Sequence, residues 1–224
     1  QMCIRDRYIE SWVHEIKAPI TAIALNCENN RDERSRYLLV ENRKVENYVD
    51  MALYYARMDA VYKDYMIAET NLQEVAQQVL LQNKYYLIQS HVKAEVACPD
   101  TVYSDKKWIA FILNQLIQNS VKYGRSEGTH IQIVTKKTKS GVLLRVKDDG
   151  IGIPKEELPR IFEKGFTGTN GRNRERSTGM GLYLCRKLCD KLNIEIRAES
   201  AEGKGTEIIL MFPVSDYLTG YRET

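Results

Sequence analysis

An acidic pair followed by two spaced glycines forms the segment DDGIG at residues 148–152. The preceding residues 142–147 predict a strand, so Asp148 stands at a strand end. A carboxylate there can accept a hydrogen bond from an exocyclic amine such as that of adenine. Gly150 and Gly152 would let the backbone pass close to a ligand without a Cβ in the way. The same pattern also occurs in ordinary turns, so alone it is a weak indication of a ligand site.

A second glycine-rich segment, STGMGL at residues 177–182, opens a predicted helix over about 181–192. Backbone N–H groups at a glycine-lined helix start form a natural phosphate site, and a plain turn before a helix is the alternative. The intervening residues 164–176 are rich in Gly, Thr, Asn and Arg, which is typical of a mobile lid over a nucleotide. The sequence has neither a Walker motif nor GxGxxG after a first strand, which excludes P-loop and Rossmann sites.

Two polar residues, Asn119 and Lys122, lie three positions apart in a predicted helix over about 107–123 and therefore share a face. An amide oxygen can ligate Mg²⁺, and a lysine can contact phosphate oxygens. Such a pair is also common on ordinary helix surfaces. The pair therefore indicates a nucleotide site only in combination with the glycine-rich segments that follow it.

One histidine, His14, lies in the segment WVHEIKAP at residues 12–19, within a predicted helix. Neutral imidazole, with an ordinary pKa of about 6.5, offers a nucleophilic nitrogen at neutral pH. Glu15 can orient the ring or take its proton, and Pro19 can kink the helix. A lone helical histidine is more often a packing or surface residue, so its role depends on the rest of the chain.

Two amphipathic helices are predicted at the start of the chain, over about 8–29 and 35–59, with a polar turn at 29–33. They should form an antiparallel hairpin. A single hairpin has too small a core, so two copies are expected to pair into a four-helix bundle, which predicts a homodimer. Residues 1–7 match no pattern and are assigned no function.

The rest of the chain mixes helices with strands. The predicted elements are a strand at 65–68, a helix at 72–87 capped by Asn71, a strand at 92–97, the helix at 107–123, a strand pair at 131–135 and 142–147, a helix at 181–192, and strands near 194–198 and 207–212. Mostly antiparallel strands with helices predict a two-layer α/β sandwich, and the whole chain is assigned to the α+β class. The expected domains are 8–60 and 61–216, with tails at 1–7 and 217–224.

The order of these motifs resembles the sequence boxes of histidine kinases. The matching pieces are NxxKY at 119–123, DxGxG at 148–152, IFEKGF at 161–166, TGMGL at 178–182 and GKGT at 203–206, which correspond to the N, G1, F, G2 and G3 boxes, and residues 12–19, which resemble the H box. The resemblance implies the GHKL (Bergerat) ATP-binding fold shared with gyrase, MutL and one family of heat-shock chaperones.

The resemblance also implies residue roles. His14 would be phosphorylated from ATP with the help of Glu15, and would then pass the phosphoryl group to an aspartate of a response regulator. Asp148 would recognise the adenine amine, with Thr206 supporting that contact through water. Asn119 would hold Mg²⁺. The other implied nucleotide contacts are Lys122, Tyr123, Gly150, Gly152, Gly179 and Gly181.

Three positions depart from the family pattern. Gln115 stands where a first Asn is usual, which keeps the amide. Ser177 replaces a common Gly, so the hinge of the lid is expected to be stiffer. Ala18 stands four residues after His14, where many relatives carry a Thr or Asn that positions a water for phosphatase chemistry.

Bulk properties narrow the class of protein. The 224 residues are 43% hydrophobic and 28% charged with a net charge of +3, which indicates a soluble globular chain and does not favour nucleic-acid binding. Five cysteines without a CxxC pair argue against a zinc site or a disulfide framework. No apolar stretch approaches the roughly 18 residues of a membrane helix, and no signal peptide is visible. The chain as given is therefore expected to be cytoplasmic, and the resemblance to sensor kinases implies that it is the cytoplasmic portion of a bacterial membrane protein.

The short hairpin and the start YIESW at residues 8–12 look most like kinases that sense antimicrobial peptides alongside ABC transporters. That finer resemblance implies upstream membrane helices, an OmpR-like response regulator and an ABC transporter as a possible partner. Two alternatives remain. One is a nucleotide-binding interaction module in which His14 is idle, and the other is a serine kinase of the anti-sigma type, which would lack the hairpin.

Overall fold

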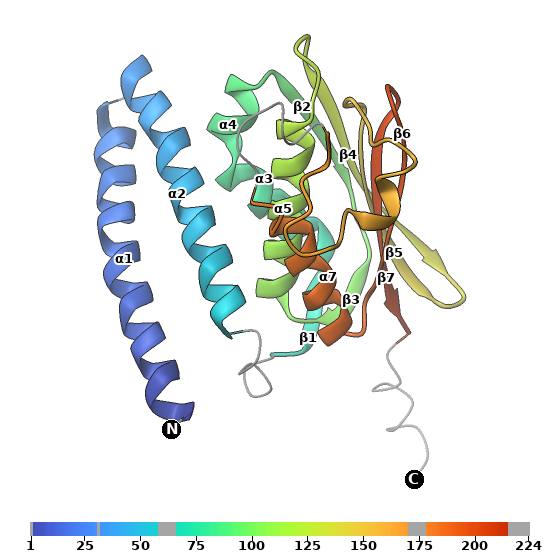
Figure 1. Ribbon diagram of the computed structural model, residues 1–224, viewed down its shortest axis with the longest axis horizontal. Helices are drawn as coiled ribbons and strands as arrows, with labels where there is room; N and C mark the ends of the chain where they lie inside the picture. Colours follow the sequence, from blue (N-terminus) through green and yellow to red (C-terminus); the bar gives the residue numbers. More distant parts are fainter. Residues whose placement is uncertain (1, 31, 58–65, 170–177, 215–224) are drawn as a thin grey trace. The chain divides into compact units, whose positions relative to one another are not determined.

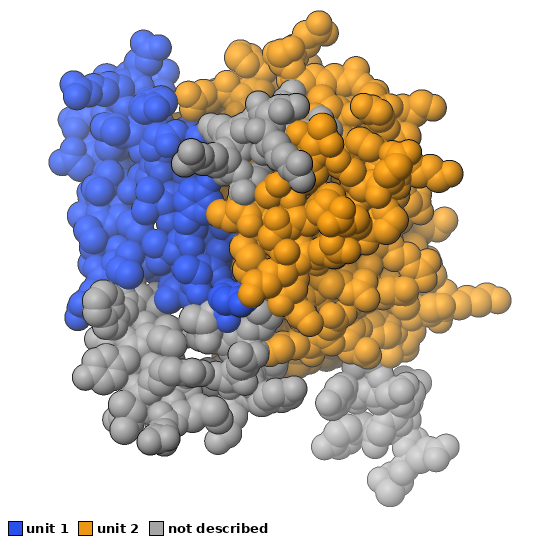
Figure 2. All heavy atoms as spheres, in the orientation of Figure 1, with its two compact units in different colours: residues 1–65 blue, residues 66–224 orange. Residues whose placement is uncertain are grey.

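The computed structural model describes residues 2–30, 32–57, 66–169 and 178–214, with only the backbone described for residues 2–14, 56 and 57. The chain divides into two compact units, Gln1–Tyr65 and Met66–Thr224, which Figure 2 shows in different colours. Each unit has its own architecture and is considered by itself.

The first unit is a hairpin of two long helices, α1 (Met2–Asn30) and α2 (Glu33–Arg57) (Figure 1). Helix α1 already begins at Met2, six residues before the predicted start at Tyr8, so residues 2–7, which matched no sequence pattern, continue the helix. Helix α2 begins two residues before the predicted Ser35 because the Asp32 carboxylate accepts a hydrogen bond from the Ser35 N–H at 2.6 Å and caps the first turn.

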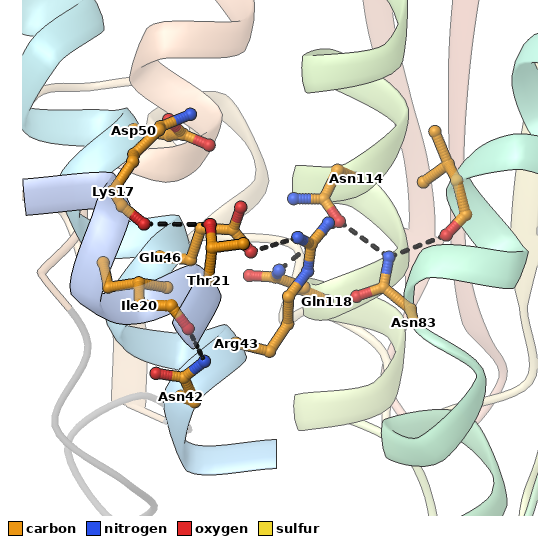
Figure 3. A network of polar contacts seen from close by, with 11 residues as sticks. Lys17, Ile20, Thr21, Asn42, Arg43, Glu46, Asp50, Asn83, Asn114 and Gln118 are labelled. Atoms are coloured by element: carbon orange, nitrogen blue, oxygen red, sulfur yellow. Dashed lines mark hydrogen bonds and ion pairs between the residues drawn. The ribbon is translucent and has the colours of Figure 1, made fainter. Parts of the chain in front are cut away.

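Polar contacts join the two helices of the hairpin. The Lys17 ammonium lies 2.7 Å from the Asp50 carboxylate, and the Asn42 amide donates to the Ile20 carbonyl at 2.8 Å (Figure 3). Apolar side chains on both helices remain exposed in the single chain. They include Ile16, Ile23, Leu25, Leu38 and Val45. The hairpin therefore buries only part of its apolar surface.

The second unit is built on a five-stranded sheet of order β2-β4-β5-β7-β6, in which only the β2–β4 pair is parallel. Its strands are β2 (Val92–Ala97), β4 (Thr129–Thr138), β5 (Gly141–Asp148), β6 (Glu195–Ala201) and β7 (Gly205–Pro213). Helices α3 (Leu72–Gln82), α4 (Lys84–Gln89), α5 (Lys106–Lys122) and α7 (Gly181–Lys191) form the second layer (Figure 1). The predicted two-layer α/β sandwich is confirmed.

Two local predictions in this unit were wrong, and one strand was missed. The first strand, β1 (Ala68–Asn71), lies three residues later than expected, where it pairs with β3 (Thr101–Ser104), a strand that was not predicted. The helix expected over 72–87 is broken at Asn83. The Asn83 side chain is buried and donates to the Val79 carbonyl and to Asn114 on α5, both at 2.8 Å (Figure 3). Such side-chain bonds to the backbone compete with the helix ladder.

Helix α5 is the centre of the core and carries part of the site. Asp105 caps its start by accepting from the Lys107 N–H at 2.9 Å. Fully buried side chains follow along one face, namely Ile109, Ile112, Leu113 and Ile117. Because this face is fixed against the sheet, the last turn of α5 holds its polar residues in fixed positions next to the end of β5.

Candidate functional site

The Asp148 carboxylate is held at the end of β5 by three hydrogen bonds. Ser120 Oγ donates to Oδ2 at 2.9 Å, and the N–H groups of Gly150 and Thr206 donate to Oδ1 at 3.0 and 3.1 Å. The side chain is buried, with 9% of its surface exposed. Burial raises the pKa of Asp148 above its ordinary value, and the three donors oppose that rise. The result is an oriented acceptor with little access to water.

The loop after Asp148 requires glycine at two positions. A Cβ on Gly150 would lie 2.5 Å from the Tyr123 carbonyl oxygen, and a Cβ on Gly152, where φ is +70°, would lie 2.1 Å from the Ala201 carbonyl oxygen. Backbone hydrogen bonds explain this tight fit, since Ile151 donates to the Tyr123 carbonyl at 3.0 Å and accepts from the Gly203 N–H at 2.7 Å. The loop is thus tied to the end of α5 and to the β6–β7 turn.

A cavity opens beside Asp148. Its lining comes from α5, the sheet, the loop after β5, residues 157–168 and the start of α7: Leu116, Asn119, Ser120, Tyr123, Val146, Asp148, Gly152, Ile153, Glu157, Ile161, Phe166, Thr167, Gly168, Leu182, Thr206 and Ile208. The walls are mainly apolar. Among the described residues that line the cavity, only Asp148 and Glu157 carry a charge. An apolar slot with one buried acceptor suits a flat heterocycle that bears an amine.

The sequence-predicted residues fall into two groups. Asn119, Tyr123, Asp148, Gly152 and Thr206 line this cavity. Gly150 does not line it but donates to the Asp148 carboxylate.

Lys122 and the two predicted phosphate glycines are not among the lining residues. The Lys122 ammonium lies 6.0 Å from the centre of the Tyr123 ring. Gly179 and Gly181 stand at the start of α7. A Cβ on Gly181 would lie 2.8 Å from Oε1 of the buried Gln115, and Gly179, at φ +63°, accepts a hydrogen bond from the Gly165 N–H at 3.0 Å. The start of α7 therefore packs directly on Gln115 of α5 and on the backbone at Gly165.

Sequence reasoning missed three residues of the site. Ser120 donates to the Asp148 carboxylate, and Ser200 Oγ accepts from the Ile153 N–H at 2.9 Å and lies 3.1 Å from the Thr206 hydroxyl. Glu157 lines the cavity from the turn before the short helix η1 (Leu158–Arg160). Ser120 directly follows Asn119 in the sequence, and this position is what could have marked it as a site residue. Ser200 and Glu157 belong to no recognisable motif.

His14 and Glu15 belong to the first unit, on α1. Glu15 is exposed. The side chain of His14 lies outside the described residues, as do Ser177 and residues 170–176 of the expected lid. Ala18 lies on α1, is exposed and brings no polar side-chain atom to the helix surface.

Metal and membrane features are limited in the part of the chain that the structure describes. No group of three or more His, Cys, Asp or Glu side chains there could hold a metal ion. No helix there is both long and apolar enough to cross a membrane. The Asn119 amide in the cavity wall could supply one oxygen ligand to a cation that takes its other ligands from phosphate and water, as Mg²⁺ commonly does.

Comparison with known proteins agrees with this geometry. Residues 104–216 match the family described as histidine kinase-, DNA gyrase B- and HSP90-like ATPases. The chain is 32% identical over 93% of its length to the sensor histidine kinase YxdK of Bacillus subtilis, and 35% identical over 96% to the sensor protein kinase GraS of Staphylococcus aureus. The chain spans 65% and 63% of the lengths of these two relatives.

Solved structures show the same fold. The catalytic domain of histidine kinase ThkA covers 66% of this chain at 26% identity with a TM-score of 0.57, and 97% of that domain is matched. The Acinetobacter baumannii histidine kinase AdeS covers 90% of this chain, and 98% of AdeS is matched, with a TM-score of 0.62 at 20% identity, which supports the fold alone. The resemblance drawn from the sequence motifs is confirmed: the chain belongs to the family of histidine kinase-, DNA gyrase B- and HSP90-like ATPases and is similar over nearly its whole length to sensor histidine kinases.

Proposed function

We propose that this chain is the catalytic portion of a two-component sensor histidine kinase, which uses ATP to phosphorylate His14 and then passes the phosphoryl group to an aspartate of a response regulator. The observation that carries the proposal is the buried Asp148 carboxylate, held by three donors at the wall of an apolar cavity. Similarity to sensor kinases over both units supports the same conclusion.

In this proposal the cavity binds the adenine of ATP. Asp148 accepts a hydrogen bond from the exocyclic amine, and Thr206 supports that contact through a water. Gly150 and Gly152 would shape the base pocket, because only glycine lets the loop after β5 pack against the carbonyl oxygens of Tyr123 and Ala201. Apolar side chains such as Ile153 and Phe166 would cover the ring faces.

The phosphate end of ATP would be held by residues near the ends of α5 and α7. Asn119 would supply an amide oxygen to Mg²⁺, which supplies charge neutralisation at the phosphates when it is bound. Lys122 and Tyr123 would contact the nucleotide. Gly179 and Gly181 would let phosphate oxygens approach the N–H groups at the start of α7, a position where the helix dipole favours negative charge.

His14 would act as the nucleophile. A nitrogen of its imidazole forms a bond to the γ-phosphorus, while the bond from that phosphorus to the bridging oxygen of ADP breaks and the electron pair leaves with ADP. Glu15 takes the proton released from the ring. A carboxylate oxygen of the regulator's aspartate then bonds to the phosphorus while the bond from the imidazole nitrogen to the phosphorus breaks, and the proton held by Glu15 returns to the ring, which regenerates neutral His14.

We assign dimerisation and phosphotransfer to residues 8–60 and ATP binding to residues 61–216. Exposed apolar side chains on both helices of the hairpin support pairing of two copies into a four-helix bundle. Ile23, Leu38 and Val45 are 48, 43 and 50% exposed in the single chain, which is unusual for residues on amphipathic helices. A homodimer would bury them.

The wider setting is also a proposal. By resemblance to kinases that sense antimicrobial peptides, we propose an OmpR-like response regulator, an ABC transporter as a possible partner and a place on the cytoplasmic side of a bacterial membrane, where ATP is present. Similarity to sensor kinases supports the coarser statement that the partner is a response regulator.

The test is incubation with Mg²⁺ and ATP labelled on either the γ- or the α-phosphate. A self-phosphorylating kinase retains covalent label from the γ-position only. A nucleotide-binding interaction module with an idle His14 binds both nucleotides and retains no covalent label from either, and that result would reject the proposal.

A further inference from the structure

The charged side chains among the described residues that line the cavity beside Asp148 are all negative, which determines which part of a nucleotide the cavity can bind. Its described lining contains two carboxylates, Asp148 and Glu157, and no cation. Phosphate groups carry negative charge and would be repelled from such a wall. The cavity therefore suits the uncharged part of a nucleotide, the base and the sugar, with the phosphates outside it.

Glu157 is held in a defined orientation by hydrogen bonds from Thr169. Its Oε1 accepts hydrogen bonds from both the N–H and the hydroxyl of Thr169, at 2.8 and 2.6 Å. The backbone at Gly168, at φ +53°, approaches so closely that a Cβ there would lie 2.5 Å from Oε2. Among the described residues nothing donates a hydrogen bond to Oε2. One oxygen thus fixes the carboxylate, and the other remains an acceptor at the cavity wall.

The two carboxylates differ in a way that matches the two kinds of donor on a nucleoside. Asp148 is buried and Glu157 is half-buried. Adenosine triphosphate presents donors only at its exocyclic amine and at the two ribose hydroxyls. Since the amine is flat and belongs to the part that enters an apolar slot, it fits the buried acceptor. The hydroxyls belong to the more hydrated sugar and fit the half-buried one.

We propose that Glu157 is a specificity-determining residue that accepts a hydrogen bond from a ribose hydroxyl of the nucleotide whose base Asp148 binds. This inference rests on the proposed function. A hydrogen bond from a neutral hydroxyl to a carboxylate is charge-assisted and favours the ligand that carries the hydroxyl. Glu157 would thereby make the site prefer ribonucleotides to deoxyribonucleotides.

The experiment compares the calorimetric affinities of ATP, 2′-deoxy-ATP and 3′-deoxy-ATP for the wild type, Glu157→Ala and Glu156→Ala. Glu156 is a matched control because it is an exposed acidic neighbour that does not line the cavity. In the wild type and in Glu156→Ala, one deoxy analogue should bind about tenfold more weakly than ATP, the equivalent of one hydrogen bond to a charged group. In Glu157→Ala that ratio should fall close to one.

The possible outcomes distinguish a failure of the proposed function from a failure of the role proposed for Glu157. If the wild type does not bind ATP at all, the proposed function fails. If it binds ATP and both deoxy analogues equally well, only the role of Glu157 is rejected. An equal loss of affinity for all three nucleotides in Glu157→Ala, with the ratio preserved, would show that the carboxylate only anchors Thr169, and this would also overturn the inference.

Discussion

Replacing Asp148 by Asn should abolish tight ATP binding while leaving the fold in place. Asn keeps Oδ1, which can still accept from the N–H groups of Gly150 and Thr206. The new amide nitrogen takes the place of Oδ2, and the Ser120 hydroxyl can rotate to accept from it instead of donating. The cost of burying a carboxylate also disappears. We therefore expect the free energy of unfolding to change by less than about 1 kcal/mol.

Nucleotide binding responds differently because the amide presents a donor to the adenine amine. Losing a hydrogen bond to a charged acceptor costs about 1.5–3 kcal/mol, which corresponds to about a 10- to 150-fold weaker affinity. Donor facing donor adds to that loss. Calorimetric titration with ATP measures this loss. Asp149→Asn is the matched control, since Asp149 accepts from the His130 N–H at 2.8 Å and is not among the described residues that line the cavity. Unchanged affinity in Asp148→Asn would remove Asp148 from the nucleotide site.

Four further predictions follow from the same account. His14→Gln should bind ATP as the wild type does, measured by calorimetry, and should incorporate no label from γ-labelled ATP; retained label would identify another acceptor. Gly152→Ala should lower the free energy of unfolding, measured in urea, by about 2–3 kcal/mol, because a Cβ there clashes with the Ala201 carbonyl oxygen. In the control Gly165→Ala, where φ is similarly positive but the space is open, the free energy of unfolding should fall by only about 1 kcal/mol. Ala18→Thr should dephosphorylate a phosphorylated response regulator about 100-fold faster at unchanged autophosphorylation, since the hydroxyl can position a water; equal rates would show that water is placed otherwise. Burial raises the pKa of Asp148, so its carboxylate is protonated at a higher pH than that of an exposed aspartate. As the pH is lowered, ATP affinity should therefore begin to fall at a higher pH than the ordinary aspartate pKa would give. An affinity profile that follows an ordinary carboxyl pKa would contradict this assignment.

The sequence predicts the site best where backbone geometry constrains residue choice. At Gly152 a side chain would collide with a carbonyl oxygen, so the motif that signals the site is also the only residue pattern that fits the loop. The apolar row of α5 likewise determines which face is buried, and therefore where Asn119 lies. These features depend on local spacing, which can be read from one chain.

Other features depend on contacts between distant segments and could not be predicted. The helix break at Asn83 depends on its bond to Asn114, 31 positions away. The short strand β3 exists because it pairs with β1, 30 to 36 positions earlier. Glu157 belongs to the cavity because residues 166–169 come back beside it. Tertiary partners of this kind leave no periodic signal in the sequence.

The central claim is that the γ-phosphoryl group of ATP is transferred to His14. The most direct measurement is mass spectrometry of the chain after incubation with Mg²⁺ and ATP, digested at neutral pH in parallel with an acid-treated sample. The account predicts a phosphate on the peptide that contains His14, lost after acid treatment and absent from an Asp148→Asn sample. A phosphate that survives acid on a serine, threonine or tyrosine, or no phosphate on a chain that binds ATP, would contradict it.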